Sequence, residues 1–149
     1  MSFKQNIVHH YHQLINDKIV SLTNALNDLR ESSKNETKSS AGDKYETTRA
    51  MLQLEQDKIH GQLNEAKQQQ ALLNQIDANK VLQQITIGSL VKTSKGYLLL
   101  SLALGKIVVD GITVIALSPQ SPLGVKLIGL KANDTAEMNG IDYLIKAVE

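Results

Sequence analysis

The chain has 149 residues, a formal net charge of +1, 42% hydrophobic residues and 3% aromatic residues. This length suits one medium domain or two small ones, and the apolar fraction is too high for a disordered chain. The near-neutral charge argues against a basic face that coats nucleic acid, and the few aromatic side chains argue against a base-stacking platform. Cysteine is absent, which excludes disulfides, thiolate nucleophiles and zinc held by cysteine.

The amino end is polar and has no apolar core of the kind that a secretory signal carries. The longest apolar stretch, at 97–104, is much shorter than the ~20 residues of a membrane span. We therefore expect a cytoplasmic protein with no membrane partner.

The composition of the chain changes near residue 80. Both prolines and most glycines lie beyond that point. This shift predicts a helical domain at 1–80 followed by a strand-rich domain at 81–149.

The helical domain contains two apolar series at heptad spacing, separated by a polar segment. The first series is Val8, Ile15, Leu22 and Leu29, and the second is Tyr45, Leu52, Ile59, Ala66 and Leu73. An average period of 3.5 residues is typical of helices that wrap around one another. Both series are consistent with one antiparallel register, in which Leu22 faces Ile59 and Leu29 faces Leu52. We predict an antiparallel coiled-coil hairpin with its tip near 34–46; a pair of helices from a compact bundle and a dimeric coil are the alternatives.

The second domain has the pattern of short strands joined by tight turns. The predicted strands are 88–93, 96–104, 106–109, 112–117, 133–138 and 141–148. Asp110-Gly111 and Asn139-Gly140 separate adjacent strands, and such pairs favour two-residue hairpins. Between the hairpins, Ser121 and Pro122 suit the cap and first position of a short helix. The sequence thus predicts an α+β chain that ends in a small antiparallel sheet with one short helix across it.

Two acidic residues mark the start of the second long helix. Asp43 and Glu46 are three residues apart, so a helix places them on one face, with Cβ atoms about 5–6 Å apart. Two such carboxylates can jointly hold a hard cation such as Mg²⁺. The same spacing suits a capping box, in which acids complement the helix dipole, and the two interpretations are compatible.

Two short motifs resemble those of a known family in type and order. The first is Gly42-Asp43-x-x-Glu46, and the second is the run SPLGVKLIG at 121–129. Together with the layout of the chain, they resemble the Gre-type bacterial transcript-cleavage and elongation factors (GreA/GreB-like), as a divergent member. The resemblance implies an N-terminal antiparallel coiled coil and a C-terminal FKBP-like domain.

The resemblance also implies a partner and a role. In the family, the coiled coil enters the secondary channel of RNA polymerase, and the tip acids help to hold Mg²⁺ for cleavage of backtracked RNA. Carried over, Asp43 and Glu46 hold Mg²⁺ jointly with the polymerase, and Ser121 and Pro122 dock on its rim.

The resemblance further implies a protein that is not itself an enzyme and has no catalytic residue of its own. No metal is then bound by the chain alone, RNA is contacted only within the polymerase complex, and no independent DNA binding is expected.

The chain departs from the family pattern at the tip. The family usually has Leu at the position of Lys44 and Asn at the position of Thr47, and Val125 replaces a common Arg. Tyr45 follows Lys44 at the tip. Lys44 lowers the local negative charge. Two alternatives therefore remain open: a relative that occupies the channel without cleavage activity, and a coiled-coil adaptor that binds another protein.

Two further candidates have less support from the sequence. His9, His10 and His12 could bind a transition metal, or they could form a solvated helix face. Prolyl isomerase activity needs an aromatic-lined pocket, and the second domain offers only Tyr97 and Tyr143.

Overall fold

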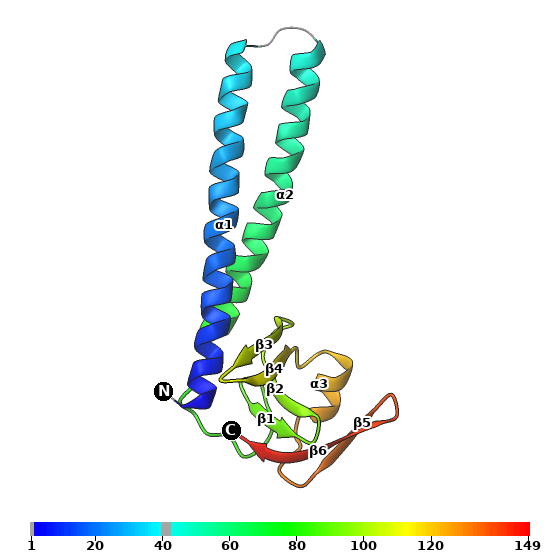
Figure 1. Cartoon of the computed structure of the whole chain (residues 1–149). Helices are drawn as coiled ribbons and strands as arrows, with labels where there is room; N and C mark the ends of the chain where they lie inside the picture. The colour runs from blue at the N-terminus through cyan, green and yellow to red at the C-terminus, as the bar shows by residue number, and fades with distance from the viewer. Residues whose placement is uncertain (1, 40–42) are drawn as a thin grey trace. The chain divides into compact units, whose positions relative to one another are not determined.

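A computed structural model describes the backbone of residues 2–39 and 43–149, and the side chains of 2–34 and 46–149. The chain divides into two compact units, one of residues 1–12 with 71–149 and one of residues 13–70. The elements in chain order are α1 (Phe3–Ser39), α2 (Asp43–Asn74), β1 (Leu90–Thr93), β2 (Gly96–Leu100), β3 (Gly105–Val109), β4 (Ile112–Leu117), α3 (Pro122–Leu127), β5 (Thr135–Met138) and β6 (Ile141–Val148) (Figure 1). The expected α+β class is confirmed.

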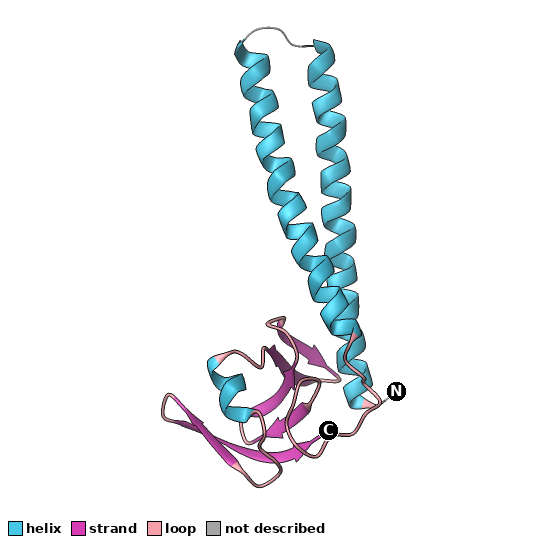
Figure 2. Cartoon of the chain, turned by 180° about the vertical axis from the view of Figure 1, so that it is seen from behind, coloured by secondary structure: helices cyan, strands magenta, loops and turns pink. Residues whose placement is uncertain are grey.

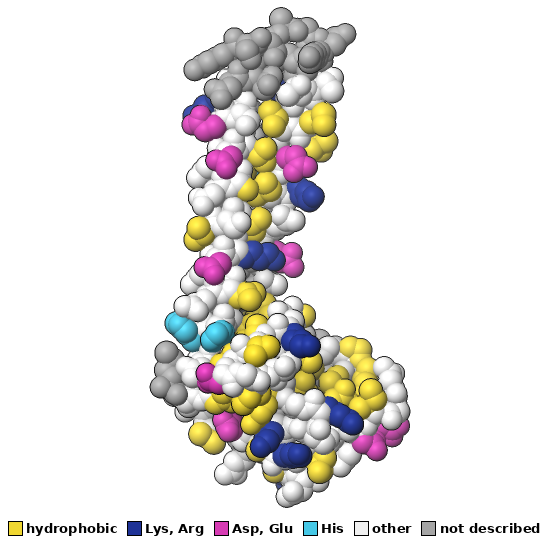
Figure 3. Space-filling model, viewed as in Figure 1, with side chains coloured by type: hydrophobic (Ala, Val, Ile, Leu, Met, Phe, Trp, Pro, Cys, Tyr) yellow, Lys and Arg dark blue, Asp and Glu magenta, His cyan; other side chains and the backbone are white. Residues whose placement is uncertain are grey.

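In the unit of residues 13–70, the described residues, 13–39 and 43–70, belong to the two long helices, which run in opposite directions (Figure 2). In α1, the residues between 13 and 32 that are buried or half-buried are the heptad residues Ile15, Leu22 and Leu29 and the apolar residues between them, Ile19, Ala25 and Leu26. Every other residue of that range is exposed. Apolar side chains form a line along these helices (Figure 3). The predicted stripe is therefore the protected face of the helical arms.

Burial along this stripe is uneven. Ile15 and Ala66 are 1% and 0% exposed, whereas Leu22 and Ile59 are only half-buried. A hydrogen bond from the Gln70 side-chain amide to the Asn16 carboxamide oxygen, at 2.5 Å, links the two helices at the well-buried end. The pairing of Leu22 with Ile59 remains a prediction. The side chain of Tyr45, the first residue of the second series, lies outside the described residues.

The sheet has six strands in the order β3-β4-β2-β1-β6-β5. All neighbouring pairs are antiparallel except β2 and β4, which pair in parallel from Tyr97↔Val114 to Leu100↔Leu117. The expectation of a wholly antiparallel sheet is therefore wrong for this pair. The physical reason is that β3 and β4 form a hairpin whose second strand lies against β2, which gives β4 the direction of β2 and leaves β3 at the edge. The strand beside β2 is thus the one that carries the fully buried Val114.

Two predicted hairpin turns are confirmed by their backbone angles. Asp110 and Gly111 have φ values of 52° and 75°, and Asn139 and Gly140 have 53° and 77°. Positive φ at both central residues is the requirement of the type I′ turn, which matches the twist of the flanking strands. These turns join β3 to β4 and β5 to β6.

The core of the sheet unit lies between α3 and one face of the sheet. Its buried residues are Ile85, Val91, Leu98, Leu100, Leu127, Ala136 and Ile145. Gly124 allows α3 to sit close to the preceding loop, because a Cβ there would lie 2.1 Å from the Ser118 carbonyl oxygen. Position 124 therefore accepts glycine alone unless the loop moves.

The first turns of α1 pack with the strands inside the same unit. Phe3 meets Tyr97 edge to face, with ring centroids 5.1 Å apart. Tyr11 is fully buried, and its hydroxyl donates to the Gly105 carbonyl oxygen at 2.7 Å. These contacts explain why residues 1–12 group with the sheet; the domain boundary at 80/81 remains a prediction.

Among the described residues, no helix combines the length and the apolar character that crossing a membrane requires.

Candidate functional site

Ser121 caps α3 as the sequence predicted. Its hydroxyl accepts a hydrogen bond from the Gly124 backbone N–H at 3.1 Å and donates one to the Ser118 carbonyl oxygen at 2.6 Å. Pro122 follows at the first helical position, where its missing N–H costs nothing. Since the hydroxyl is already engaged on both sides, the exposed ring of Pro122 is the more available surface for a partner.

A pocket of about 320 Å³ opens beside this cap. Its lining residues come from β2, β4, α3 and the β5–β6 hairpin, with Lys95 from the β1–β2 turn: Lys95, Leu98, Ile115, Leu117, Ser121, Pro122, Leu123, Met138 and Tyr143. Most of the lining is apolar, and Ile115 remains 43% exposed at its surface. The volume lies at the lower end of the range of small ligand pockets, which is roughly 300–1,000 Å³.

The side chains that line this pocket are suited to binding a partner rather than to catalysis. Its residues include no carboxylate, imidazole or thiol that could act as a base or a nucleophile. Lys95 supplies a single positive charge beside the apolar surface. The pocket suits an apolar side chain of a partner protein with an acidic group close by.

The two tyrosines of the second domain lie in different places. Tyr143 lines the pocket, whereas Tyr97 is in contact with Phe3. The structure therefore does not bring the two rings together.

The tip motif is only partly described. Asp43 is the first residue of α2, and Glu46 lies in the same first turn with an exposed side chain. Gly42 lies outside the described residues, as do the side chains of Asp43, Lys44 and Tyr45. The backbone thus places both acids at the start of α2, and the geometry of a metal site at this point remains a prediction.

A basic residue next to the tip acids was not anticipated from the sequence. Glu46 and Arg49 line one shallow pocket on α2, together with Ala50 and Gln53. The signal was present, because Arg49 follows Glu46 by three residues, which puts the two side chains on one helix face. Arg49 is therefore a second positive residue, besides Lys44, close to the acids that are proposed to bind the metal.

Neither the protein-family models nor the curated proteins include a match to this chain. A solved structure described as "Structure of the transcription factor Gfh1" is similar to it. The identity is 16%, the alignment covers 92% of each chain, and the TM-score is 0.37. This likeness to Gfh1 is too weak to carry a statement about function.

The three histidines on α1 do not form a ligand set. His9 and His10 are exposed, and the pKa of the half-buried His12 is lowered, first by burial and then by the charge of His9. No group of three or more histidine, cysteine or acidic side chains in the described part of the chain is placed to hold a metal ion. The structure thus favours the solvated-face interpretation.

Two buried polar residues near the amino end have structural partners. The Lys4 ammonium donates to the Lys80 carbonyl oxygen at 2.9 Å, and burial lowers its pKa. Burial also raises the pKa of Tyr11 to about 12. Tyr11 lies between Val8 and Ile15 of the first heptad series, on the same apolar stripe, so its burial fits that pattern, whereas nothing in the sequence indicates that Lys4 is buried.

Proposed function

We propose that this chain is a Gre-type transcription elongation factor that binds RNA polymerase in the bacterial cytoplasm and stimulates cleavage of backtracked RNA. The observation that carries the proposal is the position of the tip motif. Helix α2 begins at Asp43, so the Gly-Asp-x-x-Glu sequence lies where two long antiparallel helices are joined.

The length of the helices supports this role. Helix α1 has 37 residues and α2 has 32. At ~1.5 Å per residue, residues 13–39 of α1 span about 40 Å. Paired helices of this length suit a protein that carries side chains into a deep channel, which a compact domain of the same mass cannot do.

The acids at the tip suit hydrolysis of a phosphodiester by two metal ions, in which one ion is held between two proteins. Glu46 is exposed at the start of α2, and Asp43 shares its helical turn. Two carboxylates provide fewer oxygens than Mg²⁺ requires, so the remaining ligands would come from the polymerase and from water. The chain would then hold no metal on its own.

The apolar pocket beside α3 supports the second contact. Pro122 and Ile115 present exposed apolar surface next to the Lys95 ammonium. We propose that this surface docks on the rim of the polymerase channel. Docking and tip chemistry would then depend on separate residues.

The test separates these two roles. The double variant Asp43→Asn/Glu46→Gln removes both charges and keeps the side-chain shapes; Asn is itself a good N-cap. We expect it to bind polymerase as the parent does and to lose stimulation of cleavage in a stalled, backtracked complex.

The chain offers a matched control. Asp28 and Glu31 repeat the Asp-x-x-Glu spacing on the exposed face of α1. The variant Asp28→Asn/Glu31→Gln should keep both binding and cleavage. Equal cleavage by the parent and the tip variant would contradict the role of the tip acids.

The second candidate is a factor that occupies the channel without stimulating cleavage. It is favoured by the two positive side chains near the acids, Lys44 in the sequence and Arg49 in the structure. A parent that binds polymerase and never stimulates cleavage would support it. If the parent does not bind polymerase, the coiled-coil adaptor is the hypothesis that remains.

A further inference from the structure

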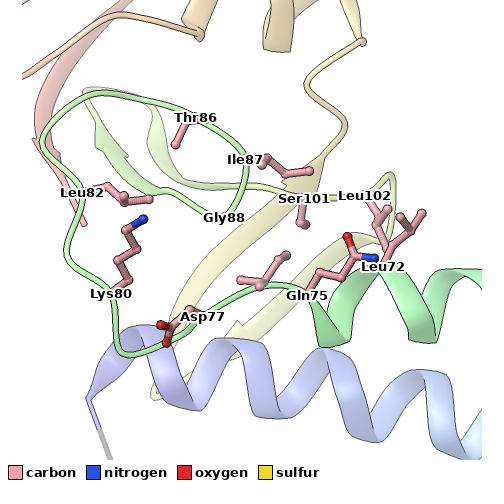
Figure 4. Close-up of a pocket in the computed structure, with 11 residues that line it drawn as sticks. Leu72, Gln75, Asp77, Lys80, Leu82, Thr86, Ile87, Gly88, Ser101 and Leu102 are labelled. Atoms are coloured by element: carbon pink, nitrogen blue, oxygen red, sulfur yellow. The ribbon is translucent and has the colours of Figure 1, made fainter.

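A second pocket, of about 350 Å³, lies in the unit of residues 1–12 and 71–149. It shares no lining residue with the pocket beside α3. Its wall is formed by the last turn of α2, the segment that connects α2 to β1, and the residues that follow β2 (Figure 4). The proposed function does not use this pocket.

Ser101 gives the pocket a polar floor. The residue is 2% exposed, and its hydroxyl oxygen is buried with no hydrogen-bond partner among the described residues. Figure 4 shows its side chain pointing from the end of β2 toward Gln75. Leaving a buried hydroxyl unpaired costs stability, so such a group in a pocket points to a ligand that completes the bond.

Ser89 shows what a purely structural serine does in the same region. It is 0% exposed, and its hydroxyl accepts a hydrogen bond from the Thr86 backbone N–H at 2.9 Å. The two buried serines therefore form a natural comparison, because one is paired within the chain and the other is not.

The sides of the pocket are apolar. Ile76, Leu82 and Leu102 are half-buried around the opening, and Ile87 is 57% exposed at the rim. Gly88 lies in the floor with a φ of +90°, and a Cβ there would stand 3.5 Å from the Ile76 side chain. A side chain at position 88 would be strained and would narrow the pocket.

The charges of the lining are balanced. Asp77 and Lys80 are both exposed and carry opposite signs. The pair offers a charged ligand group one attractive and one repulsive partner, and the group would lose its hydration next to the apolar walls. The lining therefore selects a neutral group for the hydrogen bond to Ser101.

We propose that this pocket binds a small, neutral aliphatic molecule whose single hydroxyl or carbonyl group hydrogen-bonds the Ser101 hydroxyl. The aliphatic body lies against Ile76, Leu82 and Leu102. The pocket volume falls within the range of small-ligand sites.

The test uses the full chain and follows the methyl resonances of Ile76, Leu82 and Leu102 by NMR. 1-Hexanol and 2-hexanone are the neutral probes, and hexylammonium and hexanoate are the charged controls of equal length. We expect saturable shifts with the neutral probes and weaker binding of both ions. Ser101→Ala should weaken binding of the neutral probes by roughly threefold to tenfold, as expected for one hydrogen bond.

Two further measurements separate binding from folding. Ser101→Ala without a probe should melt at or above the temperature of the parent, because the hydroxyl has no partner to lose. Ile87→Asp, at the exposed rim, should weaken binding, while Val81→Asp, 77% exposed and outside this lining, should not. Equal binding by the parent and Ser101→Ala, tight binding of either ion, or a lower melting temperature for Ser101→Ala would each overturn the proposal.

Discussion

Tyr11 offers a test of how the start of α1 is held within the sheet unit. Its hydroxyl donates to the Gly105 carbonyl oxygen at 2.7 Å, and the side chain is fully buried. Tyr11→Phe removes this hydrogen bond and leaves the ring in place. At pH 7 we expect a loss of about 1 kcal/mol in the free energy of unfolding, the usual net value of one such bond.

The same hydroxyl links stability to alkaline pH. Burial raises the pKa of Tyr11 from 10.0 in the unfolded chain to about 12 in the folded protein. The folded state thus holds the proton more tightly than the unfolded chain does. The stabilisation that this proton provides is complete below pH 10 and is lost as the pH rises from 10 to 12. At pH 11 the loss in the free energy of unfolding is about 1.4 kcal/mol, because Tyr11 is mostly ionised in the unfolded chain and mostly neutral in the folded protein.

Together, the hydrogen bond and the raised pKa predict that the stabilities of the parent and of Tyr11→Phe cross as the pH rises. The parent should be more stable than Tyr11→Phe at pH 7, and the two unfolding free energies should become equal near pH 11. Urea unfolding at several pH values, followed by circular dichroism, measures this difference. The pH dependence of other groups, including Lys4, is common to both proteins and cancels. A difference that stays constant between pH 7 and 12 would refute the burial of this hydroxyl, and Tyr143→Phe, which changes a partly exposed ring, is the control.

Four further substitutions test the packing. Gly124→Ala should cost about 1–3 kcal/mol, because its Cβ meets the Ser118 carbonyl oxygen, and calorimetry that shows no loss would contradict the close seat of α3. Ser89→Ala should cost about 1–3 kcal/mol, since a backbone N–H loses its acceptor; an unchanged denaturation midpoint would mean that this bond is not made. Ile15→Ala should cost about 2–5 kcal/mol and Leu22→Ala clearly less, because only the former side chain is fully buried; equal losses in urea unfolding would contradict the uneven burial of the arms.

The long helices and their protected face could be predicted from the sequence. Heptad spacing depends on which residues are apolar, and that is visible without coordinates. The uneven burial from Ile15 to Leu22 was not predictable, because spacing does not report how closely two helices approach. Turn chemistry also succeeded at Asp110-Gly111 and Asn139-Gly140, where the positive φ values follow from the residue types.

Strand order was harder to predict than strand position. The sequence predicted an antiparallel sheet, whereas β4 lies between β3 and β2 and runs parallel to β2. That order depends on tertiary burial, which no local pattern shows.

The same limit applies to the pockets. The Ser121 cap was predictable from neighbouring residues, but Lys95, Ile115 and Met138 come together only through the sheet topology. Nothing in the sequence distinguishes the unpaired hydroxyl of Ser101 from the paired one of Ser89.

The most direct test of the central claim is a cross-link from the tip to the polymerase. Ala50 is exposed on α2, about one turn beyond Glu46, and can be replaced by a photoreactive phenylalanine derivative in the full chain. Irradiation with a bacterial RNA polymerase elongation complex, followed by mass spectrometry, identifies what this position contacts. The proposed function predicts cross-links to polymerase residues that line the secondary channel close to the catalytic Mg²⁺. Cross-links confined to the outer surface of the polymerase, or none at saturating concentration, would contradict it.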